Sequence, residues 1–155
     1  MSTKSSFTAK VFIENPAGQA IKNLYDEKTL RFKQSVEVSA PYPYAYGFFL
    51  NTTSGDGDNL DCFVLTNEQI TQGQTIEVEP IGIMQVLEDG EIDHNIIAQK
   101  PGDSQKITNE VKEKLTSFVS SVFAHLPGKV MTIGDFLGKE DAIKTIEAMQ
   151  DANLC

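Results

Sequence analysis

The stretch Asp56-Gly57-Asp58-Asn59-Leu60-Asp61 places three aspartates within six residues, directly before the apolar run Cys62-Phe63-Val64-Leu65. Gly55 and Gly57 let the backbone turn tightly, so that the three carboxylates can converge on one point. A site made only of oxygen ligands selects hard cations such as Mg²⁺ or Mn²⁺ over zinc. The stretch therefore predicts a divalent-metal loop before a buried strand, with a solvated turn rich in Asp and Gly as the alternative.

A second acidic group, Glu88-Asp89-Gly90-Glu91-Ile92-Asp93, lies between two predicted strands. In a small barrel, two acidic loops at strand ends can face one cavity, and metal pairs held by Asp and Glu serve the attack of water on a phosphoryl group. Taken alone, such a group is more often the tip of a hairpin than a site. A calcium EF-hand is excluded for the first loop, because Leu60 and Asp61 stand where a ligand and the invariant glycine are required.

Around these loops the chain reads as short strands broken by turn residues. Many short strands at this spacing predict a small, mainly antiparallel barrel with helices packed outside it. The last third has a helical period, since apolar residues recur at three- and four-residue steps from Ile107 to Phe123, and Ile143, Ile146 and Met149 mark a shorter second helix. The predicted strands are 7–13, 30–32, 48–50, 62–65, 75–78, 81–86, 96–98 and 130–133.

The length and composition of the chain exclude several classes of protein and of site. A length of 155 residues fits a single domain, 1–155, which is large enough to bury a core. The formal net charge of −9 argues against a nucleic-acid surface, which needs clustered Lys and Arg. Residues 1–6 lack the apolar part of a signal peptide and no stretch is long enough to span a membrane, so we expect a cytoplasmic protein that binds no membrane. Two cysteines, Cys62 and Cys155, provide neither a disulfide framework nor a zinc site.

Four motifs follow one another along the chain: Tyr42-Pro43-Tyr44-Ala45-Tyr46-Gly47, the aspartate stretch 56–61, Pro80-Ile81-Gly82-Ile83 and the acidic group that ends at Asp93. In their order and spacing the chain resembles the soluble family I inorganic pyrophosphatases, from Glu14 to Met149. The resemblance implies an α+β, mainly β fold: a five-stranded OB-like closed barrel flanked by two C-terminal helices. It also implies a hydrolase that cleaves diphosphate into two phosphates with Mg²⁺, or Mn²⁺ in its place.

The resemblance also assigns roles to single residues. Asp58 matches the general base beside the attacking water, and Tyr46 and Lys22 match residues that act on and hold the phosphate groups. The implied metal ligands are Asp56, Asp61, Asp93, Glu88 and Glu14, although the family usually has Asp where Glu88 stands.

Most of the substrate-binding half departs from the family pattern. Gln34 stands in the place of a phosphate-binding arginine, Asn95 in that of a lysine and Leu24 in that of a glutamate, while Val122 and Phe123 replace a Tyr-Lys pair. The chain is therefore expected to be a slow enzyme or one with an altered phosphate substrate. The alternative is a non-catalytic, metal-binding paralogue with a regulatory role. Bacterial members of the family are commonly hexamers, so a homo-oligomer is also expected.

Overall fold

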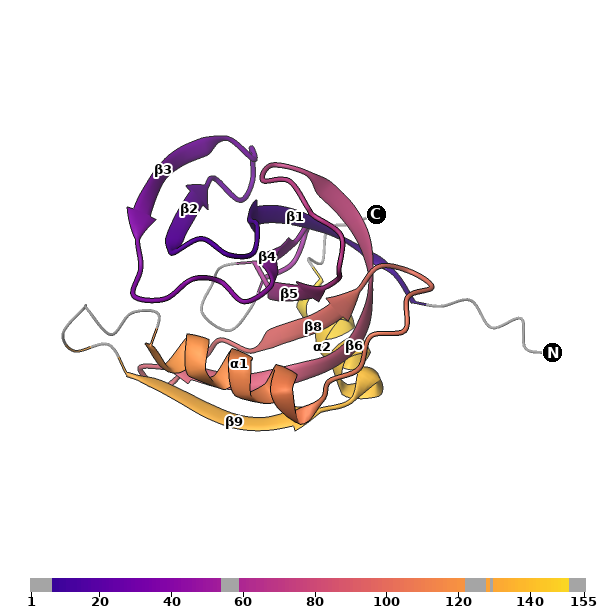
Figure 1. Ribbon diagram of the computed structural model, residues 1–155. Helices are drawn as coiled ribbons and strands as arrows, with labels where there is room; N and C mark the ends of the chain where they lie inside the picture. The colour runs from indigo at the N-terminus through magenta and orange to yellow at the C-terminus, as the bar shows by residue number, and fades with distance from the viewer. Residues whose placement is uncertain (1–6, 54–58, 122–127, 129, 151–155) are drawn as a thin grey trace.

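Strands make up most of the fold, and two helices follow them (Figure 1). The computed structural model describes residues 7–53, 59–121, 128 and 130–150. None of the helices in this part of the chain is long and apolar enough to cross a membrane. The strands are β1 Ala9–Asn15, β2 Ile21–Tyr25, β3 Phe32–Glu37, β4 Ala45–Phe49, β5 Asp61–Leu65, β6 Thr75–Glu88, β7 Glu91–Ile92, β8 Asn95–Gln99 and β9 Met131–Leu137, and the helices are α1 Asn109–Ser121 and α2 Lys139–Met149.

Five strands close into a ring in the order β1, β4, β5, β8, β6, because β6 also pairs with β1. The β5–β8 pair is parallel, and the other four pairs of the ring are antiparallel. β7 and β9 extend β6 beyond the ring, and β2 and β3 form a separate two-stranded sheet beside it (Figure 1). The prediction of a mainly β, α+β fold with a closed set of five strands and two C-terminal helices is confirmed.

Alternating side chains of the ring strands build two apolar cores, because successive residues of a strand point to opposite faces. One core takes alternate residues from all five ring strands, such as Cys62 and Val64, together with Ala142 and Ile146 of α2. The other takes the residues between them, such as Phe63 of β5, and packs them against α1. Each helix therefore covers a different core of the same ring.

Three predicted details differ from the structure. The predicted strands 75–78 and 81–86 are one strand, β6, because a register shift between Pro80 and Gly82 lets pairing continue past a residue without an amide hydrogen. The predicted strand 30–32 begins only at Phe32, since Leu30 has a left-handed backbone with φ 61° and belongs to a turn. β2 and β7 were not predicted, because the five residues of β2 do not alternate between apolar and polar and β7 has only two residues.

Thr52 stabilises the segment that enters the aspartate loop. Its buried hydroxyl donates to the Phe49 carbonyl at 2.8 Å and accepts the Leu60 amide at 2.9 Å. Thr52→Val keeps the side-chain shape but leaves the Leu60 amide without its acceptor, which costs about 1–3 kcal/mol for a buried donor. We expect urea unfolding to show a loss of that size. The matched change at the exposed Thr132 should stay within about 0.5 kcal/mol of the unmodified protein, and an equal effect of both changes would contradict this role.

Candidate functional site

One end of the ring gathers polar residues from neighbouring strands. Asp61 is the first residue of β5 and Asn95 the first of β8, and the parallel register places them side by side. On the other side of β5, Tyr46 of β4 pairs with Phe63. Glu14 lies at the irregular end of β1, in the bulge opposite Tyr46. The ring topology therefore brings these residues together although they are far apart in the sequence.

The carboxyl group of Asp61 hydrogen-bonds to that of Asp93, and it accepts a second hydrogen bond from the Tyr46 hydroxyl. Two ionised carboxylates cannot hydrogen-bond to each other, so this bond forms only while one of the two groups is protonated. Burial raises the pKa of Asp61 to about 7, although the Lys22 ammonium favours its ionised form. The negative charge of Glu14 raises this pKa further. The site is thus an acidic centre of half-buried aspartates and the buried Glu14, and the charge of one lysine acts on it.

Aromatic rings fix the position of Tyr46. Its ring centroid lies 4.9 Å from that of Phe63 and 5.3 Å from that of Tyr42, which is itself 4.5 Å from Phe118 of α1. Burial, followed by the charge of Asp61, raises the pKa of the Tyr46 phenol well above its usual value. The phenol therefore stays protonated at neutral pH and serves as a hydrogen-bond donor.

Tyr42 also belongs to this site, although it was not among the predicted site residues. It is buried, and burial together with the charges of Glu14 and Asp61 raises its pKa. The spacing of Tyr42, Tyr44 and Tyr46 at every second residue is the signal that could have indicated it, because alternate residues of an extended segment share a face.

Lys22 approaches the carboxyl pair from the two-stranded sheet. The buried Asn23 fastens that sheet to β1: its side-chain amide donates to the Glu14 carbonyl at 3.1 Å, and its backbone amide donates to Asn15 Oδ1 at 3.0 Å. Because neighbouring residues of a strand point in opposite directions, Lys22 leaves the opposite face of the sheet, and its charge acts on Asp61.

The neutral residues in the places of the family's cations have different surroundings. Gln34 is exposed on β3 and pairs with Leu24, which lies on the same face of the two-stranded sheet as Lys22. Asn95 is 5% exposed, and its side-chain amide donates to the Asp93 carbonyl at 3.3 Å. A longer, charged side chain therefore fits at position 34 without desolvation, whereas at position 95 it would have to be buried.

The structure brings some of the predicted site residues together and leaves others unplaced. Glu88 ends β6, opposite Glu91 of β7, so its place in the site stays a prediction. The predicted residues that lie outside the described part of the chain are Asp56, Asp58, Val122 and Phe123. Those that gather at this end of the ring are Glu14, Lys22, Tyr46, Asp61 and Asp93.

The donor set suits a hard divalent cation. Within the ranges that the structure describes, no group of three or more His, Cys, Asp and Glu side chains is arranged to hold a metal ion. Asp61 and Asp93 nevertheless offer carboxylate oxygens to each other, and a cation between them would offset the repulsion of the two ionised groups. Oxygen ligands of this kind favour Mg²⁺ or Mn²⁺.

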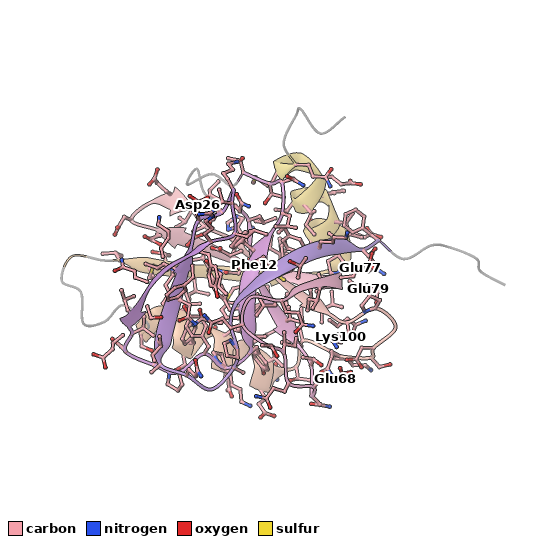
Figure 2. All side chains as sticks on the ribbon, turned by 90° about the horizontal axis from the view of Figure 1, so that it is seen from above. Phe12, Asp26, Glu68, Glu77, Glu79 and Lys100 are labelled. Atoms are coloured by element: carbon pink, nitrogen blue, oxygen red, sulfur yellow. The ribbon has the colours of Figure 1, made fainter. Side chains whose placement is uncertain are left out.

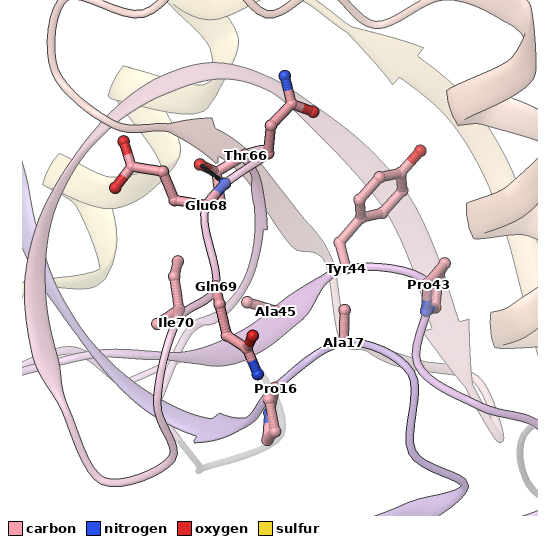
Figure 3. A pocket seen from close by; sticks show the side chains of 10 residues that line it. Pro16, Ala17, Pro43, Tyr44, Ala45, Thr66, Glu68, Gln69 and Ile70 are labelled. Carbon is pink, nitrogen blue, oxygen red and sulfur yellow. Dashed lines mark hydrogen bonds between the residues drawn. The ribbon is translucent and has the colours of Figure 1, made fainter.

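A separate hollow of about 340 Å³ lies between the β1–β2 loop, the segment before β4 and the β5–β6 loop (Figure 3). Figure 3 shows Glu68 and Gln69 on one wall and Ala17 and Pro43 on the other. Glu68 is engaged by the ammonium of Lys100 at 2.6 Å. None of the predicted site residues lines this hollow, so it is distinct from the acidic centre.

The raised pKa of Asp61 predicts how the stability of the metal-free protein depends on pH. The pKa is about 7 in the folded protein against an unperturbed 3.8, so the folded state binds this proton more tightly than the unfolded state. The resulting stabilisation is complete below about pH 4 and is lost as the pH rises through 7. In EDTA, we expect the free energy of unfolding in urea to fall by on the order of 1–3 kcal/mol between pH 5 and pH 8. Asp61→Asn should lack this fall, and an equal fall in both proteins would contradict the assignment.

The comparisons of this sequence with a family model and with known proteins lead to the same family. The family model described as inorganic pyrophosphatase matches residues 11–153. An inorganic pyrophosphatase of Nanoarchaeum equitans is 33% identical over 150 residues, which cover 90% of this chain and 94% of that protein. One of Sulfolobus acidocaldarius is 30% identical over 149 residues, which cover 88% of this chain and 86% of that protein.

Solved structures resemble this fold along nearly its whole length. The inorganic pyrophosphatase from Thermus thermophilus has a TM-score of 0.84 at 24% identity, with 96% of this chain and 92% of that chain covered. The inorganic pyrophosphatase from Coxiella burnetii has a TM-score of 0.82 at 28% identity, with 94% and 95% covered. The predicted OB-like fold is confirmed by this likeness.

Proposed function

Because this chain belongs to the inorganic pyrophosphatase family, we infer that it is an enzyme that hydrolyses inorganic diphosphate to two phosphates. The observation that carries this inference is the meeting of Asp61, Asp93, Tyr46 and Lys22 at one end of the ring. The relatives are named as inorganic pyrophosphatases and give no support to a non-catalytic role. A cytoplasmic location and a homo-oligomer stay predictions.

Asp61 and Asp93 are the proposed centre of a Mg²⁺ site, completed by Asp56 of the aspartate stretch. Their hydrogen bond supports the assignment, because two carboxyl groups so placed need either a proton or a cation between them. Glu14 adds negative charge beside the pair, and Glu88 is proposed as a further ligand from the acidic hairpin. A bound Mg²⁺ would neutralise charge on the diphosphate oxygens and lower the pKa of water at the site.

The chain's own side chains supply the rest of the chemistry. Lys22 is proposed to bind a phosphate oxygen through its ammonium, and the protonated Tyr46 phenol is proposed to donate a hydrogen bond. Asp58 is proposed to accept the proton from the attacking water. Water then adds to one phosphorus, the bridging P–O bond breaks, and the second phosphate leaves with the bridging oxygen.

The experiment that tests the function is phosphate release from diphosphate, measured with MgCl₂ and with EDTA. We expect release to depend on Mg²⁺ and on diphosphate, and Mn²⁺ to substitute for Mg²⁺. Failure to release phosphate under any of these metals, from a protein whose circular dichroism shows a folded state, would support the non-catalytic alternative instead.

Gln34→Arg is expected to raise kcat/KM for diphosphate by about tenfold, because a charge-assisted hydrogen bond to phosphate contributes about 1.5–3 kcal/mol. The exposed position of Gln34, on the same face as Lys22, gives an arginine room to reach a phosphate bound there. Lys33→Arg, at the neighbouring position of β3 that has no partner in the β2 register and already carries a positive charge, is the matched control and should change kcat/KM by less than about twofold. Because Lys33→Arg leaves the net charge unchanged, an equal gain in both variants would show a general effect of arginine on this strand and not a new phosphate contact at position 34.

A further inference from the structure

The turn between β2 and β3 contacts the segment that leads into Asp61. A carboxylate oxygen of Glu27 accepts the backbone amide of Asn59 at 2.8 Å, although the two residues are 32 positions apart. Asn59 is 5% exposed, so its amide has little access to water. Hydrogen bonds to an ionised acceptor are about twice as strong as neutral ones. The contact therefore joins the aspartate stretch to a different part of the fold.

Glu27 sits on a turn that its neighbours hold in one conformation. The side-chain Oδ1 of Asp26 accepts the amides of Lys28 at 2.9 Å and Thr29 at 2.8 Å, and the Asp26 carbonyl accepts the amide of Leu30 at 2.8 Å. Residues 26–31 close the two-stranded sheet, since the Asp26 amide donates to the carbonyl of residue 31 at 2.9 Å. The backbone of Glu27 is thus fixed relative to the sheet that carries Lys22.

The segment is also held from β4. The Asn59 side-chain amide donates to the Phe49 carbonyl at 3.2 Å, and the Leu60 amide donates to the Thr52 hydroxyl at 2.9 Å. Both bonds link residues 49–52 to residues 59–60. Among the hydrogen bonds of residues 59 and 60 that the structure describes, the one to Glu27 is made with the turn that joins β2 to β3.

We propose that Glu27 is a positioning residue for the divalent-cation site, because it fixes residues 59–61, and with them the carboxylate of Asp61, relative to Lys22. The inference rests on the proposed function, in which Asp61 is a metal ligand. Groups that hold a metal ligand in place typically change metal affinity by 10–100-fold when they are lost. Without Glu27, the buried Asn59 amide lacks this acceptor, and the segment can move to find another.

The test measures the binding of Mg²⁺ alone by calorimetry. Glu27→Ala removes the acceptor and is expected to raise the Kd for Mg²⁺ by at least about tenfold. Glu27→Gln keeps an acceptor oxygen but not the charge, and should restore the Kd to within about threefold of the unmodified protein. Glu68→Ala is the matched control, because it removes the same charge from an exposed loop and should leave the Kd unchanged. Figure 2 shows Glu68 and Lys100 well away from the turn at Asp26.

A second variant tests the donor side of the same bond. Asn59→Pro removes the amide hydrogen and also the side-chain bond to Phe49, so the rise in the Kd for Mg²⁺ that it causes is not specific to Glu27. The specific test is that adding Glu27→Ala to Asn59→Pro should change the Kd by less than about twofold. The melting temperature in EDTA is recorded for each variant, which separates a loss of fold from a loss of metal binding. If Asn59→Pro does not fold, the comparison of Glu27→Ala with Glu27→Gln decides the question.

The outcomes separate this inference from the proposed function. If the unmodified protein binds Mg²⁺ and Glu27→Ala binds it with the same Kd, Glu27 does not position the site and the proposed function still stands. If Glu27→Gln is as impaired as Glu27→Ala, the charge matters rather than the hydrogen bond, which also overturns the inference. If the unmodified protein binds no Mg²⁺, both fail.

Discussion

Asp61→Asn is expected to abolish measurable Mg²⁺ binding and, with it, the hydrolysis of diphosphate. The amide keeps the shape of the side chain and can still accept the hydrogen bond from Tyr46, but it carries no negative charge to attract a cation. Because Asp61 is a proposed ligand rather than a residue behind one, the rise in the Kd for Mg²⁺ should exceed the 10–100-fold typical of supporting residues. Calorimetry with MgCl₂ and a phosphate-release assay measure the two effects.

The folded state of Asp61→Asn should survive without metal. Burial disfavours the ionised carboxylate, so at pH 8 the neutral amide is expected to leave the metal-free protein at least as stable as before. Asp135→Asn, at an exposed position of β9, is the control and should bind Mg²⁺ normally. An unchanged Kd in Asp61→Asn would show that the metal site lies elsewhere in the chain.

Asp58→Asn is expected to lower kcat by about 10²–10⁴, the usual contribution of a general base. Water that attacks phosphorus must lose a proton, and an amide cannot take it up near neutral pH. Because Asp58 is not a proposed metal ligand, its variant should retain Mg²⁺ binding, which distinguishes it from Asp61→Asn. Steady-state kinetics with saturating MgCl₂ gives kcat.

Two further measurements show how a loss of activity in Asp58→Asn should be interpreted. The circular dichroism spectrum should not change, since Asp58 stands in a polar, glycine-containing stretch of the sequence. A variant that keeps full activity would show that another group accepts the proton. A variant that loses Mg²⁺ binding as well would assign Asp58 to the metal ligands and leave the general base open.

Much of the fold could be predicted from local patterns. Cys62 and Val64 alternate with Phe63 and Leu65 along β5, and both sets are buried, as expected for a strand between two apolar layers. The helical period around Leu115 likewise predicted α1. The join of 75–78 with 81–86 could not be predicted, because a bulge that carries a strand past a proline depends on its pairing partners.

Parts of the candidate site could not be predicted from the sequence. The acidic stretch predicted a metal loop from composition and glycine spacing alone, but the burial that raises the pKa of Asp61 depends on every strand around it. Tyr42 was missed because its place beside Asp61 and Glu14 follows from the closure of the ring. Glu27 gave no signal, since a glutamate in a polar turn is ordinary and its partner Asn59 is 32 residues away.

By itself, the sequence determined most of the strands and both helices, which carboxylates lie close together along the chain, and which family the motifs resemble. These properties follow from neighbours within a few residues, where backbone geometry and side-chain period act directly. The tertiary structure alone decided that Asp61 touches Asp93 and Tyr46, that Lys22 faces them, and that Glu27 reaches Asn59. The reason is physical: hydrogen bonds and charges act over a few ångströms in space, and only the closing of the ring brings distant residues within that range.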